Sequence, residues 1–327
     1  MTASSDLSEK VTVIIRSVDE RTEVACRNLV LEQGIKPDGL ITIREKPFSK
    51  ALRLGCEIGI QEGRPWTFFV DADVLLRRRS IDRIINLAES QSDNVCEIQC
   101  YVLDKFFGGP RPAGNHLYRT SLLPEFLNCI PEEGVNIRPE TYALTTMATR
   151  GFPWVSVSEV VGLHDFEQSY QDIFRKSFVH SHKHLFFAEY LVSFWRDRAR
   201  DDKDYLVALA GFGAGIRQFE ETRIDSRHSH FSDWDKWIDV PAKHPLEVSI
   251  WNLDRIDREI EEWVGPEAFM DVFPTAMVEK SQSFWMNCRR FLRMHEPKRG
   301  KFKTLLLALS LLLGHLPKKL RQYLEFR

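Results

Sequence analysis

Short apolar runs alternate with amphipathic stretches along the first part of the chain. Val11 to Ser17 and Leu40 to Arg44 are apolar runs of the length and composition that form buried strands. Glu20 to Gln33 and Phe48 to Gln61 have apolar positions at helical spacing, and a glycine follows each of them closely. The order strand, helix, strand, helix predicts a parallel sheet with helices on both of its faces.

A third apolar run, Trp66 to Val70, ends in two acids one residue apart, Asp71 and Asp73. Charged side chains are costly to bury unless they are paired or bound to a metal, and ligands of α/β sheets bind just past the carboxyl ends of the strands. Residues i and i+2 of an extended segment point to the same side, so both carboxylates can converge on one hard cation and the diphosphate that it carries. An ordinary strand end followed by a helix start is the alternative.

Strands and helices continue to alternate as far as residue 161. The further predicted helices are Ser80 to Ser90, with Ser80 as its cap, and Glu140 to Arg150. The further predicted strands are Val95 to Val102, His116 to Arg119 and Trp154 to Val161. The segment before the predicted strand at His116, GGPRPAGN from Gly108 to Asn115, is rich in glycine and proline. This composition indicates a loop whose backbone approaches another group closely.

Helical signals replace strand signals in the second half of the chain. Gln171 to Asp201 is charged and rich in aromatic residues, which indicates one long amphipathic helix or a pair of helices. Within it, His180 and His184 share a helix face at a spacing that can bind a metal. We expect this face to be a polar stripe instead, with Lys176 and Lys183 near phosphates.

Composition narrows the class of protein. A chain of 327 residues with 43% hydrophobic content can bury a full core and has room for one large and one smaller domain. The formal net charge of -2 gives no global sign of nucleic-acid binding. The six cysteines lack the spacing of zinc sites and are expected to be packed thiols. The first residues lack the pattern of a signal peptide, which predicts a cytoplasmic, reducing location.

The end of the chain is strongly basic. Asn287 to Arg327 contains eleven Lys or Arg and two acids. Its apolar stretch, Thr304 to Pro317, is shorter than the roughly 20 residues that span a bilayer. Such a segment is typical of a helix on the anionic inner face of a membrane, although a core helix with a solvated tail has the same composition. Three regions are expected: a polar tail (1–10), an α/β domain (11–168) and a helical region (169–327) that ends in the basic tail.

Three segments carry a resemblance to a known family. They are VTVIIRS (Val11 to Ser17), PFSKALRLGCEIGI (Pro47 to Ile60) and FFVDADVLL (Phe68 to Leu76). In this order they resemble parts of the nucleotide-sugar glycosyltransferases of the GT-A fold, particularly the family-2 type and its chondroitin-polymerase and galactosyltransferase relatives. A weaker likeness continues through Gly108 to Leu123, Arg138 to Val157 and His164 to Gln168, so the resemblance covers residues 11 to 168.

The resemblance implies a fold and a set of site residues. The fold is α/β of the GT-A, Rossmann-like type, with a central, mostly parallel sheet, helices on both faces and here a mainly helical region after it. The implied donor-binding residues are Arg16, Ser17, Lys50, Asp71, Asp73, Gly109, Gly114 and Asn115. The implied ligands of Mn2+ or Mg2+ are Asp71, Asp73 and His164.

Glu140 is the implied catalytic base. The family has an acid at the start of the corresponding helix, where it takes the proton of the acceptor hydroxyl. The next residue here is Thr141, where the family has a second acid, so Glu140 would act alone. The helix dipole also favours an acid at this position. The interval before the acidic strand is about one βα unit shorter than in the family, which leaves Glu45 as the candidate to contact the nucleotide base.

The sequence therefore predicts a metal-dependent glycosyltransferase. The resemblance implies transfer from a nucleotide-sugar donor, most plausibly a UDP-sugar, to a hydroxyl of a glycan or glycolipid, with inversion at the anomeric carbon. A nucleotidyltransferase acting on sugar phosphates is one alternative, although the glycine-rich loop with Arg and Lys expected after its first strand is missing from the sequence. A non-catalytic protein that binds sugar nucleotides and membranes is the other.

Overall fold

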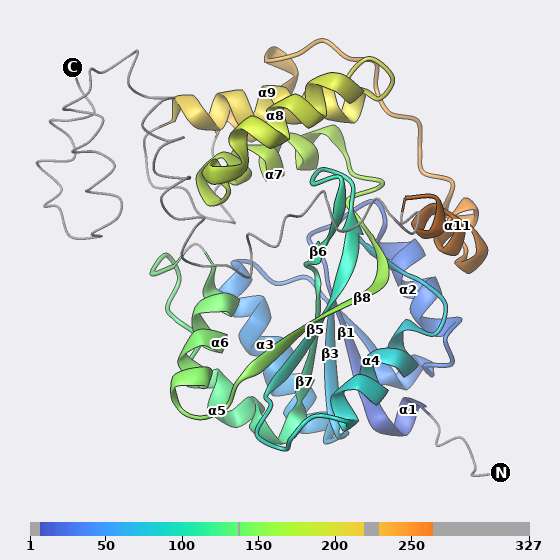
Figure 1. Cartoon of the computed structure of the whole chain (residues 1–327), viewed down its shortest axis with the longest axis vertical. Helices are drawn as coiled ribbons and strands as arrows, with labels where there is room; N and C mark the ends of the chain where they lie inside the picture. The colour runs from blue at the N-terminus through green and yellow to red at the C-terminus, as the bar shows by residue number, and fades with distance from the viewer. Residues whose placement is uncertain (1–6, 137, 219–228, 264–327) are drawn as a thin grey trace, which may run out of the picture.

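A computed structural model describes residues 7–136, 138–218 and 229–263 of the chain (Figure 1). One mixed β-sheet runs through it, with strands in the order β2-β1-β3-β7-β5-β8-β4 and with β6 paired to β5. Helices cover both faces of the sheet, and a group of further helices lies beyond one end of its strands (Figure 1). The predicted α/β architecture is confirmed.

Three neighbouring strands form a parallel half of the sheet. They are β1 (Val11–Arg16), β2 (Leu40–Ile43) and β3 (Trp66–Asp71). β1 lies between the other two and is parallel to both. The register pairs Arg16, the last residue of β1, with Asp71, the last residue of β3. The two opposite charges therefore lie side by side at the carboxyl edge of the sheet.

The other half of the sheet is mixed. Its strands are β4 (Val74–Leu76), β5 (Glu97–Asp104), β6 (Gly109–Pro112), β7 (Asn115–Arg119) and β8 (Trp154–His164). β7 is antiparallel to β3 and β5, β8 is parallel to β5, and β4 is antiparallel to β8. The register pairs His164 of β8 with Asp104 of β5 on one side and with Val74 of β4 on the other. The ends of β5 and β8 and the turn between β3 and β4 thus meet.

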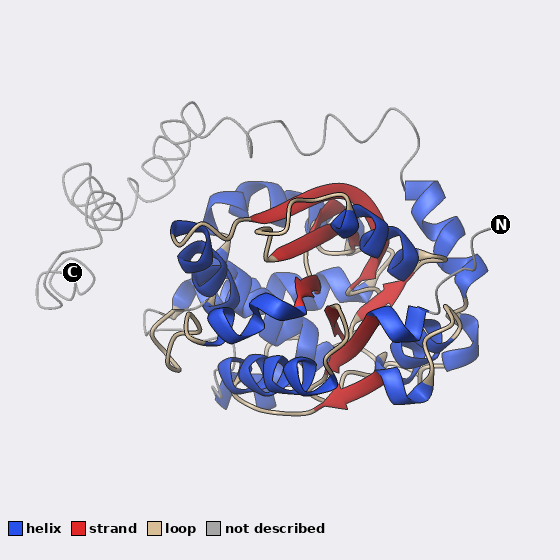
Figure 2. Cartoon of the chain, turned by 90° about the horizontal axis from the view of Figure 1, so that it is seen from below, coloured by secondary structure: helices blue, strands red, loops and turns tan. Residues whose placement is uncertain are grey.

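Helices pack on both faces of the sheet (Figure 2). They are α1 (Leu7–Lys10), α2 (Glu23–Leu31), α3 (Phe48–Glu62), α4 (Ser80–Glu89), α5 (Leu123–Leu127) and α6 (Pro139–Thr149), with the 3-10 turns η1 (Pro37–Gly39) and η2 (Thr120–Leu122). Side chains alternate between the faces along a strand. Phe68 therefore packs on the side of α2 and α4, whereas Phe69 packs on the side of α3, α5 and α6.

The elements described after β8 are helical. They are α7 (Tyr170–Lys183), η3 (Leu185–Phe187), α8 (Ala188–Arg198), α9 (Lys203–Arg217), α10 (Ser229–Ser232), η4 (Trp234–Lys236), η5 (Val248–Ile250) and α11 (Leu253–Trp263). α7, α8 and α9 pack around a separate core that contains Phe174, Trp195 and Phe212. Trp195 Nε1 donates to the carbonyl of Phe106 (2.6 Å), which joins this core to the segment after β5.

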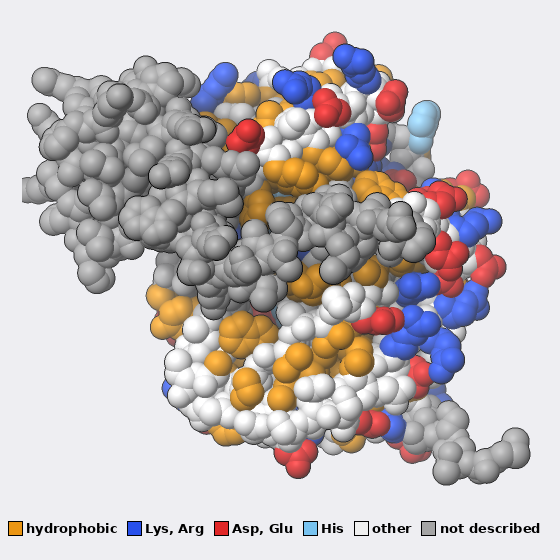
Figure 3. Space-filling model, in the orientation of Figure 1, with side chains coloured by type: hydrophobic (Ala, Val, Ile, Leu, Met, Phe, Trp, Pro, Cys, Tyr) orange, Lys and Arg blue, Asp and Glu red, His pale blue; other side chains and the backbone are white. Residues whose placement is uncertain are grey.

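α11 returns to the sheet. Its residues Ile256 and Ile260 pack with Leu163 of β8. Arg77, which follows β4, donates through Nε to Oδ1 of Asp257 (3.0 Å). Acidic and basic side chains lie next to each other on this side of the molecule (Figure 3). The helix is thus held to the sheet by an apolar contact and by ion pairs at its rim.

Some local predictions were wrong. Ser80 does not cap α4: the residue before the helix is Arg79, and the Ser80 hydroxyl donates instead to the carbonyl of Val161 (2.5 Å). The helix expected to begin at Glu20 begins at Glu23. Among the described residues, no helix is long and apolar enough to cross a membrane. The basic segment predicted to contact membranes, residues 287–327, lies outside the described residues.

Candidate active site at the carboxyl ends of the strands

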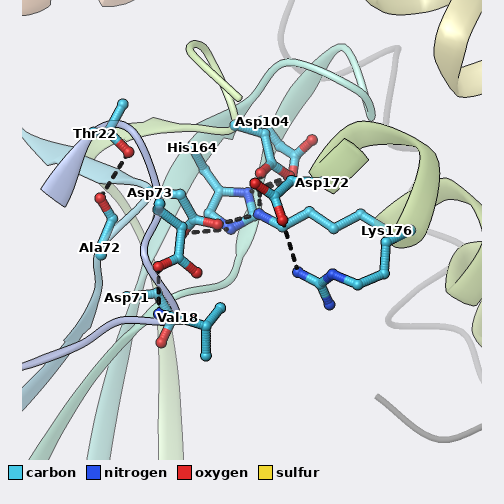
Figure 4. A network of polar contacts seen from close by, with 12 residues as sticks. Val18, Thr22, Asp71, Ala72, Asp73, Asp104, His164, Asp172 and Lys176 are labelled. Atoms are coloured by element: carbon cyan, nitrogen blue, oxygen red, sulfur yellow. Dashed lines mark hydrogen bonds and ion pairs between the residues drawn. The ribbon is translucent and has the colours of Figure 1, made fainter. Parts of the chain in front are cut away.

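Two acids and a histidine from three strand ends meet beside the turn after β3 (Figure 4). Asp73 follows β3, Asp104 ends β5 and His164 ends β8. Nδ1 of His164 lies 2.9 Å from Oδ2 of Asp104. Nε2 of the same ring lies 3.6 Å from Oδ1 of Asp73. All three side chains are buried, so the ring links two carboxylates away from solvent.

Asp104 fixes the orientation of the His164 ring. One of its oxygens accepts hydrogen bonds from the backbone N–H groups of Phe106 and Phe107 (both 2.9 Å). The other accepts from Nε of Arg111 (2.7 Å) and from His164. Burial opposes ionisation, but Arg111 and His164 hold the pKa of Asp104 well below its usual range. Because an ionised carboxylate only accepts, Nδ1 of His164 carries a hydrogen, and Nε2 points toward a second partner.

Asp165 adds a third carboxylate from a strained backbone. Its φ of 66° lies in the left-handed region, which a residue other than glycine rarely adopts. Its Oδ2 lies 3.2 Å from Nδ1 of His164, and its backbone N–H donates to the carbonyl of Asp73 (3.3 Å). A conformation of this kind costs of order 1–3 kcal/mol and persists where the surrounding structure enforces it. The fold therefore holds this carboxylate against the cluster.

The acids around His164 favour its protonated form. Burial alone would lower the pKa of this imidazole, but the carboxylates of Asp165, Asp73 and Asp104 raise it to about 9. A metal ion binds the neutral form of imidazole, so a protonated histidine must lose a proton before it can be a ligand. Cation binding at His164 would thus be linked to the release of a proton.

The cluster meets the requirements of a divalent metal site. Oδ1 of Asp73 is buried and has no hydrogen-bond partner among the described residues, and it faces the Nε2 atom of His164. Asp73, His164 and Asp165 can each offer one ligand atom, and these atoms lie within 4.8 Å of one another. Oxygen and imidazole ligands suit Mn2+, and carboxylate oxygens suit Mg2+. The residues present therefore fit the predicted metal, with Asp165 in addition to the predicted Asp73 and His164.

A lysine reaches into the same cluster. The ammonium group of Lys176, from α7, donates to Oδ2 of Asp73 (Figure 4). It also donates to Oδ1 of Asp165. Burial opposes the charge, but the two carboxylates raise the pKa of Lys176 above its usual range. The predicted place of Lys176 near phosphates stays a prediction, since the contacts of this lysine in the structure are carboxylates.

Arg16 connects two further acids at the same edge of the sheet. Its Nε donates to Oδ1 of Asp71 (2.8 Å), and its Nη1 donates to Oε1 of Glu140 (2.9 Å). Its guanidinium also lies over the ring of Phe48, 4.9 Å from the centroid. Asp71, which the sequence paired with Asp73 as a metal ligand, is thus held by an arginine, and its side chain is 32% exposed.

Glu140 is bound by three side chains from two strands, β1 and β7. Besides Arg16 of β1, the hydroxyl of Tyr118 donates to Oε1 (2.9 Å), and Nε2 of His116 lies 3.1 Å from Oε2. Burial opposes ionisation, but Arg16 and His116 lower the pKa of Glu140. Nδ1 of His116 in turn lies 2.9 Å from Oε1 of Glu97, whose pKa burial raises to about 7. Glu140 is therefore an ionised carboxylate at the end of a buried chain of polar groups.

The structure places the other predicted donor residues in different settings. The Ser17 hydroxyl donates to Glu20 (3.0 Å) near the end of β1. Lys50 is 63% exposed and pairs with Glu45 (2.6 Å). The remaining three, in and between β6 and β7, are Gly109, Gly114 and Asn115.

Of these three, Gly114 lies beside Asp71, whose backbone N–H donates to the carbonyl of Gly114 (2.9 Å). Its φ is +62°, and a Cβ there would come within 2.5 Å of Val74 and 3.4 Å of Oδ2 of Asp71. Asn115 is buried, and its amide bonds to the backbone N–H and carbonyl of Cys100 (3.0 and 2.9 Å), so this side chain joins two strands. Gly109 pairs with Asp104 in the sheet.

Several residues of the site did not stand out in the sequence. Asp104 ends an apolar strand, as Asp71 does, and the strand-end argument applied to β5 could have found it. Tyr118 and Glu97 have no comparable local signal. The helix sequence predicts only a phosphate contact for Lys176, because nothing in it indicates which acids this lysine meets.

The paired histidines of α7 pack against an aromatic ring. The rings of His180 and His184 lie 5.3 and 5.1 Å from that of Phe107, edge to face. Burial, together with nearby Arg111, lowers the pKa of His184 to about 2. The expected polar stripe was therefore wrong at these two positions, because both imidazoles are neutral rings that pack against Phe107.

Comparisons with known proteins identify distant structural likenesses. No protein-family model matches the sequence, and no curated protein matches it. The mannosyltransferase PcManGT from Pyrobaculum calidifontis, solved with GDP-Man and Mn2+, is 13% identical with a TM-score of 0.38, over 63% of this chain and 73% of that chain. A glycosyltransferase involved in the glycosylation of the major capsid of PBCV-1 is 12% identical with a TM-score of 0.36, over 49% and 96%. A cytidylyltransferase from Leptospira borgpetersenii is 9% identical with a TM-score of 0.35, over 53% and 87%.

Proposed function

We propose that the chain is a glycosyltransferase of the GT-A type that moves a sugar from a nucleotide-sugar donor to an acceptor hydroxyl. The observation that carries the proposal is the meeting of Asp73, His164 and Asp165 at the carboxyl ends of the strands. Among the described residues, Oδ1 of Asp73 has no hydrogen-bond partner, and it faces Nε2 of His164. Ligands of α/β sheets bind at this edge. The order of the sequence segments that resemble the family supports the same function.

Asp73 and His164, with Asp165, would hold Mn2+ or Mg2+. A bound divalent ion neutralises the charge that develops on a leaving diphosphate. Asp71 accepts a hydrogen bond from Arg16. We therefore assign Asp71 to the donor site and propose the other three residues as the metal ligands. The backbone at Gly114 lies so close to Val74 that a side chain at this position would clash with it, so only glycine allows this close approach.

Arg16, Ser17 and Lys50 would line the nucleotide. Arg16 ends β1 next to Asp71, and Ser17 follows it directly, so both lie at the edge where the diphosphate would bind. A guanidinium is well suited to phosphate recognition because it is planar and always charged. Lys50 is exposed near the start of α3, where it pairs with Glu45.

Glu140 would accept the proton of the acceptor hydroxyl. A general base must be ionised, and the bonds from Arg16 and Tyr118 keep this carboxylate ionised within a buried setting. Inversion requires the attacking hydroxyl and the leaving diphosphate on opposite sides of the sugar. We therefore propose an inverting transfer with a UDP-sugar as the first donor to test and a glycan or glycolipid as acceptor, at a cytoplasmic site or on the inner membrane face.

Screening nucleotide sugars with and without Mn2+ or Mg2+ tests the proposal. A true donor should raise the melting temperature in the presence of metal, since a ligand at about 100 times its dissociation constant adds roughly 2.7 kcal/mol. Asp73→Asn should abolish the metal-dependent part of this stabilisation. Asp254→Asn, which removes an exposed acid from α11, should not.

The products of the same screen separate the competing functions. Release of nucleoside diphosphate with transfer of the sugar supports the transferase. Pyrophosphate release from a nucleoside triphosphate and a sugar phosphate would instead identify a nucleotidyltransferase. Donor binding without turnover across a broad panel of acceptors would favour a non-catalytic protein.

A further inference from the structure

Lys176 occupies carboxylate oxygens of the proposed metal site. Its ammonium group donates to one oxygen of Asp73 (Figure 4). It also donates to one oxygen of Asp165, and its side chain is only 17% exposed. Both acids are among the three residues that can offer ligand atoms to one ion. Two of the three candidate ligands therefore already have a positive partner in the protein.

The packing of α7 against α9 fixes the backbone position of Lys176. α7 and α9 approach closely at Gly211, where a Cβ would come within 2.4 Å of the carbonyl oxygen of Phe174. The same holds at Gly215, where a Cβ would lie 2.6 Å from the carbonyl oxygen of Phe178. Lys176 stands between these two contact points on α7. Its ammonium can leave the acids by rotation of its side chain, whereas the helix itself has little freedom to move away.

The charges of the cluster are partly balanced by the chain itself. Two permanent cations, Lys176 and Arg111, contact the three carboxylates of Asp73, Asp104 and Asp165. An ion pair in a buried site is stronger than one in water, because the effective dielectric constant is lower. A divalent ion would therefore meet a site whose negative charge is already largely compensated.

The two carboxylate oxygens of Asp73 face different neighbours. Oδ2 faces Lys176, whereas Oδ1 accepts no hydrogen bond from the described residues and lies 3.6 Å from Nε2 of His164. A divalent ion can thus begin to bind on the Oδ1 side without displacing the lysine. Full use of Asp165 as a ligand requires the ammonium to release it.

We infer that Lys176 is a tethered cation that competes with a divalent ion for Asp73 and Asp165 and so weakens the metal affinity of the site. This inference rests on the proposed metal site of the transferase. It makes α7, an element outside the sheet, a determinant of metal affinity. The protein would then bind metal firmly only when another group, such as the phosphates of a donor, draws the ammonium away.

Metal titration of the full-length protein in the absence of donor tests this inference. Lys176→Met keeps the length of the side chain and removes the charge, so Mn2+ should bind at least about tenfold more tightly by calorimetry than it binds the wild type. Lys203→Met removes an exposed charge at the start of α9 and serves as the control, with unchanged affinity. Lys176→Arg retains the charge and should not gain affinity.

Thermal unfolding gives a second readout if Lys176→Met is unstable. Without metal this variant leaves buried carboxylates unpaired and should melt earlier than the wild type. Added Mn2+ should restore much of the loss, so the increase in melting temperature on adding metal should be larger for the variant than for the wild type. The combined variant with Asp73→Asn should lose this response, which locates the ion.

Equal or weaker Mn2+ binding by Lys176→Met, with an equal thermal response, would overturn the competition. The transferase function can survive that result, because donor turnover is measured separately in the nucleotide-sugar screen. Conversely, tighter Mn2+ binding by the variant without turnover of any donor would support the competition and contradict the proposed function.

Discussion

At the scale of single residues, the site depends on which partner each acid has. Asp73 has an oxygen that faces an imidazole, and Asp71 faces an arginine, although the two acids are only one residue apart. The turn after β3 separates them, because Asp71 is still paired in the sheet whereas Asp73 lies beyond it. Neighbouring acids in a sequence motif can thus have different roles.

Glu140→Gln should lower turnover by two to four decades with donor affinity little changed, as expected when a general base is lost (about 10²–10⁴-fold). Steady-state kinetics with a soluble acceptor and direct donor binding measure the two effects. Tyr118→Phe is the control, since it removes one hydrogen bond to Oε1 but keeps the carboxylate. A loss of donor affinity with little change in kcat would mean that Glu140 instead orients Arg16 toward the nucleotide.

At the scale of elements, the local sequence predicts the bounds of strands better than it predicts the contacts within the site. Apolar runs predicted β1 and β3 to within one residue, because buried parallel strands consist almost wholly of such runs. β5 was predicted two residues early, which left Asp104 outside its strand. The contact between Lys176 and Asp73 joins positions 103 residues apart. It depends on sheet register and on helix packing, neither of which has a local signal.

The contact between α7 and α9 can be tested with two glycines of one helix. A methyl group at Gly211 would meet the backbone of Phe174, whereas one at Gly213 would meet nothing within 4 Å. Gly211→Ala should therefore destabilise the protein by about 1–3 kcal/mol through overpacking. Gly213→Ala should be neutral or stabilising by up to about 1 kcal/mol, because alanine favours the helix. Urea unfolding measures both, and equal effects would show that the two helices are not tightly packed at Gly211.

At the scale of the whole molecule, the helices after β8 are joined to the sheet at several places. Lys176 of α7 bonds acids at the strand ends, Trp195 of α8 bonds a carbonyl after β5, and α11 packs on β8. These contacts place the helical region over the edge where the proposed donor would bind.

The basic end of the chain provides the last prediction. Residues 287–327 contain eleven Lys or Arg and two acids around a leucine-rich stretch. If this segment binds an anionic surface, the full-length protein should bind phosphatidylserine vesicles but not neutral ones, and raising salt should weaken binding because the charges act only over a Debye length. Deleting residues 301–327 should abolish vesicle binding while turnover of a soluble acceptor and the melting temperature are retained, as measured by flotation, kinetics and thermal unfolding.

The competing interpretation of the basic end is that its leucines belong to the core. Removing several buried leucines would cost several kcal/mol, since each Leu→Ala change in a core costs about 2–5 kcal/mol. The truncated protein would then aggregate or melt much earlier than the full-length chain, whatever the lipid composition. Stability of the truncated protein and its affinity for vesicles are independent measurements. A truncated protein that stays folded and active but no longer floats with anionic vesicles fits only the membrane-binding interpretation, because loss of core residues cannot leave the melting temperature unchanged.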